Sequence, residues 1–150
     1  MQSIFEPATV ESFVSRIQSL RPDTAPVWGR MNAAQMLAHN SAIFESVRTG
    51  NYPKMNPIMR WLVAGMIRPM VIGDRPYRRS SQTAPAWVIS DPRDLAKEQA
   101  RIIENLRAVH ALGRDHFEGK SNPTFGVLTS EQWSRLFLKH LDYHLGQFGA

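Results

Sequence analysis

The sequence predicts an all-α protein, a four-helix bundle built from a single domain that spans residues 1–150. Four segments repeat apolar residues at the spacing of an amphipathic helix. Almost no segment alternates apolar and polar residues as a half-buried strand does. Helix-capping residues also stand at the ends of several of these segments. The four segments are residues 7–20, 32–50, 92–113 and 129–148.

The first two helices have recognisable ends. The first begins at Pro7, because proline suits the first turn of a helix. Its apolar face consists of Val10, Phe13, Val14, Ile17 and Leu20. The second follows Asn32 as N-cap, and Gln35 stands where a capping box needs it. Gly50 ends this helix, since glycine readily adopts the left-handed conformation at a helix C-terminus.

Residues 51–90 have an irregular pattern in which prolines recur. A short helix is expected over residues 57–67, followed by loops. A connection of this length in a small domain is usually functional or a crossover. We therefore expect this segment either to be functional or to be a crossover, and it could cover one end of the bundle.

The third helix is expected to take Ser90 or Asp91 as its N-cap, with Pro92 in its first turn. It ends near Gly113. Its buried side is Leu95, Ile102, Leu106 and Val109. Residues 114–128 are interpreted as a loop.

The fourth helix follows Thr129, with Gln132 completing a second capping box, and it carries two histidines on its apolar face. His140 and His144 are one helical turn apart, so both rings lie on the same side. Unpaired polar groups are costly to bury, and one divalent metal ion would satisfy both imidazoles. The surrounding apolar face is Trp133, Leu136, Phe137, Leu141, Leu145 and Phe148.

A third ligand has to come from another helix, and His39, beside the apolar face of the second helix, is the candidate. Gln35, one turn earlier, could orient its imidazole. Leu141 stands where a zinc protease of the H-E-x-x-H type has its glutamate, so the general base of that class is absent. Two alternatives stay open: His39 as an ordinary core histidine, and His140 with His144 bonded to backbone or water.

The net charge of +5 is concentrated in the crossover. No helix-turn-helix, zinc-finger or RNA-binding signature accompanies it, so we do not expect nucleic-acid binding. The charge fits either a solvated surface or the attraction of a small anionic substrate, with Arg78 and Arg79 as candidate substrate-binding residues. The basic residues of the crossover are Lys54, Arg60, Arg68, Arg75, Arg78 and Arg79.

The composition also bears on the compartment. Cysteine is absent, which excludes disulfides, zinc ribbons and a thiolate nucleophile, and it fits a reducing cytosol. The N-terminus lacks the basic start and apolar run of a signal peptide. The longest apolar stretch, residues 58–72, contains Arg60 and Arg68 and is too short and too charged to span a bilayer. We expect a cytoplasmic protein that does not insert into membranes.

Two blocks of sequence resemble a known family. Residues 26–39, PVWGRMNAAQMLAH, form one block, and residues 122–149, with NPTFGVLT, EQW and KHLDYHLGQFG, form the other. Both are similar to the DinB/YfiT-like superfamily of metalloenzymes, in the branch described as domain of unknown function 1569. Asn122 and Tyr143 stand where that branch commonly has histidine.

The resemblance implies a fold and a chemistry. The fold is a four-helix bundle with up-down-down-up topology and a long crossover between helices two and three. The site is a three-histidine divalent-metal centre, and by position it maps onto His39, His140 and His144. Some members of the superfamily use low-molecular-weight thiols in transfer or isomerisation reactions.

The first functional hypothesis is therefore a divalent-metal-dependent enzyme, with zinc or nickel as the expected ion. Its activity would be a thiol-dependent S-transfer or isomerisation of a small electrophile, which the resemblance favours over the alternative of metal-dependent hydrolysis. The second hypothesis is a non-catalytic helical bundle that binds a metal or a ligand. The expected partners are a small-molecule substrate and a low-molecular-weight thiol, and a homodimer is left open.

Overall fold

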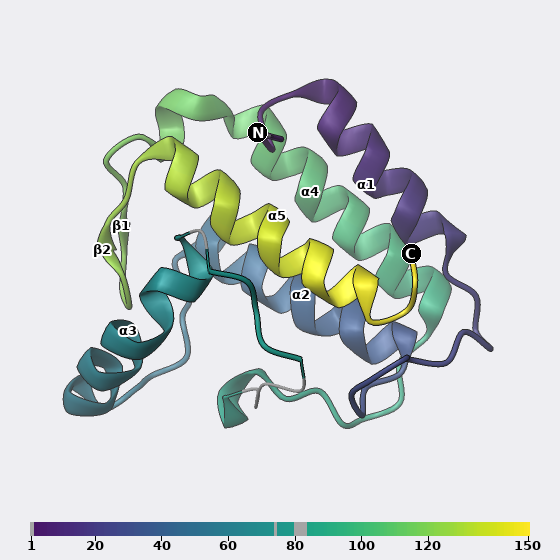
Figure 1. Cartoon of the computed structure of the whole chain (residues 1–150). Helices are drawn as coiled ribbons and strands as arrows, with labels where there is room; N and C mark the ends of the chain where they lie inside the picture. The colour runs from purple at the N-terminus through teal and green to yellow at the C-terminus, as the bar shows by residue number, and fades with distance from the viewer. Residues whose placement is uncertain (1, 74, 80–83) are drawn as a thin grey trace.

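The computed structural model describes residues 2–73, 75–79 and 84–150. Within these residues the protein is mostly helical, with helix-bundle packing, so the predicted all-α class is confirmed at that level (Figure 1). The elements are α1 (Pro7–Ser19), α2 (Ala33–Thr49), α3 (Pro57–Val71), the 3-10 turn η1 (Pro85–Trp87), α4 (Leu95–Phe117), β1 (Ser121–Asn122), β2 (Gly126–Val127) and α5 (Ser130–Gly146).

The directions of the bundle helices follow from their hydrogen bonds. Arg101 on α4 bonds Glu45 on α2 at 2.6 Å, and nearer the helix starts Gln35 donates to the Asp91 carbonyl, so α2 and α4 are parallel. Ile4 and Arg16, near the two ends of α1, bond Ser134 and Asp142 of α5. Thus α1 and α5 run together, opposite to α2 and α4 (Figure 1).

The core lies between these four helices and includes most of the residues that the apolar spacing predicted, although Leu95 is only partly buried. Residues that this spacing did not predict are also fully buried, among them Ile4, Phe117 and Leu128. Trp133 and Phe137 of α5 are fully buried and stack at 6.0 Å between ring centroids. Phe137 also packs on Phe44 of α2 at 4.6 Å. The indole N–H of Trp133 donates to the Lys120 carbonyl, which satisfies its one polar atom.

Both predicted capping boxes are present, and they set where α2 and α5 begin. The Asn32 side chain accepts from the Gln35 N–H, while the Gln35 side chain accepts from the Asn32 N–H. Thr129 and Gln132 make the same pair of bonds. Gly50 follows α2 in the left-handed conformation, as predicted.

The start predicted for α4 is wrong. The N-cap is Asp94, whose carboxylate accepts from the Lys97 N–H at 2.8 Å, rather than Ser90 or Asp91. Asp91 instead forms an ion pair with Arg93 at 2.9 Å. At the other end, Gly113 (φ +78) interrupts the helical geometry as expected, but another turn follows it.

Residues 121–127, expected to be loop, form a short hairpin. Ser121 pairs with Val127 and Asn122 with Gly126. The Asn122 side chain accepts from the Thr124 and Phe125 N–H groups and so closes the turn. Two-residue strands are too short to leave an alternating pattern in a sequence.

The crossover between α2 and α4 contains α3, which projects from the bundle (Figure 1). It runs four residues further than the expected 57–67, with Pro69 inside its last turn. No residue of α3 is buried, and Trp61 and Met66 are 75% and 81% exposed. Among the described residues, no helix combines the length and hydropathy required to cross a membrane.

Candidate metal centre

Two helices that run in opposite directions bring the three predicted histidines together. His39 lies two turns after the Asn32 cap of α2, and His140 and His144 lie on successive turns of α5. The Val27 N–H donates to the Gln147 carbonyl at 2.7 Å, which ties the segment before α2 to the end of α5. His39 and His144 are buried, and His140 is partly buried.

The imidazoles converge on one point. The ring of His39 lies 5.2 Å from that of His140 and 4.9 Å from that of His144, and the two α5 rings are 4.6 Å apart. One nitrogen from each ring lies within 4.8 Å of the others. The Nε2 atoms of His39 and His140 are 3.0 Å apart. Ligand nitrogens on a tetrahedral zinc ion are about 3.3 Å apart, given bonds of about 2.0–2.1 Å.

In His39 and His144, the hydrogen bond at Nδ1, which faces away from the cluster, decides which ring nitrogen carries the proton. Nδ1 of His39 lies 2.8 Å from the Trp87 carbonyl, and Nδ1 of His144 lies 2.5 Å from Oε1 of Gln147. Both partners accept only, so each Nδ1 must donate. Since the neutral ring carries one proton, Nε2 of both histidines presents a lone pair to the cluster.

The orientation of Gln147 is itself held by a second bond. Its Nε2 donates to the Trp28 carbonyl at 3.3 Å, which leaves Oε1 directed at His144. Gln147 is buried. A chain of contacts therefore runs from Trp28 through Gln147 to His144 and fixes this imidazole in one tautomer.

The environment keeps all three imidazoles neutral. Burial lowers the pKa of His39, and burial together with the neighbouring His39 lowers the pKa of His144 to about 4. Burial and the two neighbouring histidines lower the pKa of His140 well below its ordinary value. Neutral imidazole is the form that binds metal.

Gln35 does not orient the imidazole of His39, the role that was predicted for it. Its side chain accepts from Asn32 in the capping box and donates to the Asp91 carbonyl at 3.2 Å. The bond that orients His39 comes instead from the Trp87 carbonyl, which the crossover brings to the cluster. No sequence signal marks a backbone carbonyl, whereas Gln147, one turn after His144, could have been found from helical spacing.

The two arginines proposed for substrate binding lie near the cluster on an exposed segment. The Arg79 guanidinium lies 4.6 Å from the centre of the Trp28 ring. The carbonyl of Arg78 accepts from the Tyr143 hydroxyl at 3.1 Å. Their neighbour Tyr77, which no sequence pattern marks, packs edge-on against His140 at 5.9 Å.

The donor set fits a divalent transition metal. Among the described residues, the only group of histidine, cysteine or carboxylate side chains close enough to share an ion is His39, His140 and His144. Three neutral nitrogen ligands suit zinc, nickel, iron and copper rather than calcium or magnesium, which prefer oxygen. The other described histidines do not join the cluster: His110 bonds the Ile4 carbonyl and His116 lies beside Lys120.

Comparison with known proteins places the chain in a family. Residues 7–150 match the family described as protein of unknown function DUF1569, and the chain belongs to it. This family is part of the DinB/YfiT-like superfamily, as the sequence blocks indicated. Searches of curated proteins and of solved structures found no significant match.

Proposed function

We propose that this DUF1569 protein is a divalent-metal-dependent enzyme that joins a low-molecular-weight thiol to a small electrophile or uses the thiol to isomerise it. The ion would be held by His39, His140 and His144. The observation that supports this proposal is the convergence of three neutral imidazoles, two of which have their Nε2 lone pairs fixed toward the cluster.

The ligand count favours catalysis over a purely structural role. Structural zinc sites are normally closed by four protein ligands, whereas catalytic sites have three and leave a position open. When bound, the ion supplies Lewis acidity that lowers the pKa of a thiol or a water in that open position. Zinc or nickel remains the proposed ion, since imidazole ligands suit both.

The protein's own groups set up this chemistry. Trp87 and Gln147 hold two imidazoles in the ligating tautomer, so binding requires no rearrangement of their protons. The rings of Tyr77 and Tyr143 pack against His140 and His144, respectively. In the described part of the chain no carboxylate lies close enough to share an ion with the three histidines, so the cluster itself supplies no carboxylate base for a bound water. A thiol substrate needs less help than water, since its pKa is much lower, which favours thiol transfer over hydrolysis.

The first test is metal content. Protein purified without added metal is expected to contain about one zinc or nickel ion per chain, a loading that follows from one three-ligand site. The variants His39→Ala, His140→Ala and His144→Ala should each lose it. The matched control His110→Ala, whose ring bonds the Ile4 carbonyl away from the cluster, should retain it.

The second test separates a catalyst from a binding protein. Cobalt-loaded protein should change its visible absorption when cysteine is added, because a thiolate donates charge to cobalt. The same protein should accelerate attack of cysteine on 1-chloro-2,4-dinitrobenzene, in which the C–S bond forms and chloride leaves. A tightly bound ion whose spectrum no thiol alters would instead support a non-catalytic metal-binding bundle.

A further inference from the structure

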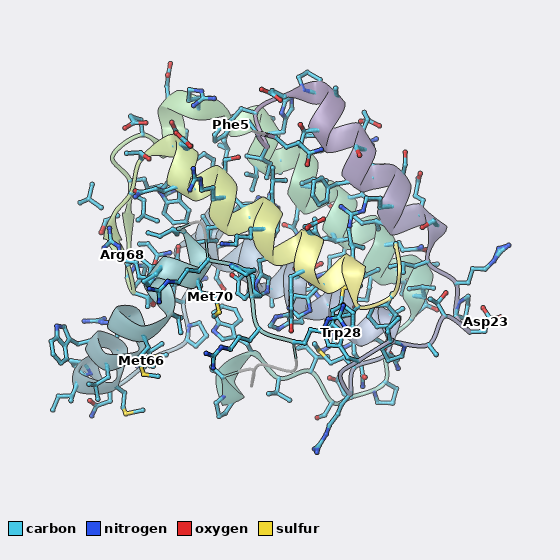
Figure 2. The ribbon with its side chains drawn as sticks, in the orientation of Figure 1. Phe5, Asp23, Trp28, Met66, Arg68 and Met70 are labelled. Atoms are coloured by element: carbon cyan, nitrogen blue, oxygen red, sulfur yellow. The ribbon has the colours of Figure 1, made fainter. Side chains whose placement is uncertain are left out.

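Two buried hydrogen-bond donors beside the histidine cluster have no partner in the described part of the chain. They are the indole Nε1 of Trp28 and the hydroxyl of Tyr77. The ring of Tyr143 contacts both side chains, with its centroid 6.2 Å from that of Trp28 and 5.1 Å from that of Tyr77. We call these three side chains the aromatic wall. Trp28 lies beside the end of α5 (Figure 2).

The aromatic wall contacts the candidate metal centre through both of its tyrosines. Tyr77 packs edge-on against His140, and Tyr143 packs edge-on against His144 at 5.1 Å. The Tyr77 segment is tied down across α5, because Lys139 donates to the carbonyls of Gly73 and Arg75. These contacts hold the segment that carries Tyr77 in place, and they do not involve either of the two unpartnered donors.

Unpartnered donors of this kind call for a ligand. Buried donors in folded proteins are nearly always paired, because losing water without gaining a partner costs free energy. The indole N–H can only donate. The Tyr77 phenol is protonated at neutral pH and can donate one hydrogen bond. Tyr143 differs, since its hydroxyl already donates to the Arg78 carbonyl.

The positive charge beside the aromatic wall indicates that the ligand is an anion. The Arg79 guanidinium lies over the Trp28 ring, and Arg79 is exposed. No ion pair between Arg79 and a carboxylate is present among the described residues. Two neutral donors and one cation match a planar carboxylate, whose two oxygens accept several hydrogen bonds.

We propose that the aromatic wall binds a carboxylate group of the substrate or thiol, with Trp28 Nε1 and Tyr77 Oη as donors and Arg79 as the counter-charge. This inference rests on the proposed function for one premise, which is that a substrate or a thiol reacts at the histidine cluster. The wall itself requires no metal. The substrate class is thus a small acid whose carboxylate is bound at the wall while its reacting atom lies at the three histidines.

The test is a binding experiment read out at the indole itself. Protein labelled with ¹⁵N-tryptophan gives one indole resonance for each of the four tryptophans, and Trp28→Phe assigns the Trp28 signal. Titration with propionate, which carries a carboxylate and no thiol, should shift that resonance. The Trp61 resonance, from an exposed position on α3, should stay unchanged.

Conservative variants identify the donors. Tyr77→Phe keeps the ring and removes one donor, so it should weaken propionate binding, read at the Trp28 indole, about five-fold, as expected for one hydrogen bond. Arg79→Gln should weaken binding and reduce its dependence on salt. The control Tyr52→Phe, outside the wall, should bind as the unaltered protein does.

The outcomes separate this proposal from the proposed function. A propionate-dependent shift in metal-free protein supports the wall even if no metal binds to the histidines. Metal binding without any shift of the Trp28 resonance overturns the wall and leaves the metal centre intact. A shift with inorganic phosphate but not with propionate also overturns it, because the ligand would then not be a carboxylate.

Discussion

Replacing Gln147 by leucine removes the acceptor that holds the proton of His144 on Nδ1. Leucine has a similar volume but cannot accept, so the buried Nδ1–H loses its partner. The alternative tautomer places the proton on Nε2 and removes the lone pair directed at the cluster. Loss of such a partner lowers metal affinity about 10–100-fold, equivalent to about 1.4–2.7 kcal/mol.

The assay is a competition titration of zinc between the protein and a fluorescent chelator at neutral pH. Gln99→Leu is the matched control, because it also loses two amide hydrogen bonds, to the carbonyls of Ile17 and Leu20, but lies away from the histidines. Gln147→Glu keeps an acceptor and should recover most of the affinity. If folded Gln147→Leu binds zinc as tightly as the unaltered protein, or if Gln99→Leu loses as much, the tautomer argument fails.

Three further predictions concern Gly29, the pH dependence of stability and the buried Trp133. In Gly29→Ala the new Cβ would lie 2.7 Å from the amide nitrogen of Gln147, so zinc affinity should fall several-fold in the same titration. Gly50→Ala, also at positive φ but with nothing within 4 Å, should leave zinc affinity unchanged although it strains the backbone. The metal-free protein should lose stability as the pH falls from 6.5 towards about 4, because the pKa of His144 is lowered to about 4 in the folded state and the unfolded chain binds the proton first. For His144 alone that loss amounts to about 3 kcal/mol in urea unfolding, and a stability independent of pH over this interval would contradict the burial of a neutral His144. Trp133→Ala should cost about 3–5 kcal/mol in the same assay because it empties a fully buried site. Trp61→Ala, 75% exposed, should change stability by no more than about 0.5 kcal/mol, and equal losses for the two would refute the assigned core.

The three histidines could be predicted from the sequence because their signal is local. His140 and His144 are separated by one helical turn, and the apolar residues around them identify the face they share. His39 follows from the same logic on α2. Helical periodicity and the two capping boxes sufficed to locate α2 and α5, which present all three rings.

The partners that orient these rings were harder to predict because they come from distant or irregular segments. The Trp87 carbonyl reaches His39 from a crossover whose path depends on tertiary packing. Tyr77 lies in a proline-rich stretch without periodicity, so its contact with His140 leaves no pattern. Gln35 was assigned to His39 because it lies one turn away, yet the capping box and Asp91 already engage its amide.

The start of α4 shows how local signals can compete. Ser90, Asp91 and Asp94 are all plausible N-caps, and Pro92 favoured the earlier ones. The pairing of Asp91 with Arg93 leaves Asp94 to cap the helix. That choice depends on side-chain partners, which residue preferences alone do not specify.

The most direct test of the central claim is X-ray absorption at the zinc edge of protein loaded with one equivalent of zinc. The three-histidine centre predicts scattering from three imidazole ligands, with zinc–nitrogen distances of about 2.0–2.1 Å. Substituting any one of His39, His140 or His144 should remove one imidazole contribution or abolish binding. A spectrum with no imidazole scattering, or one unchanged in all three variants, would contradict the account.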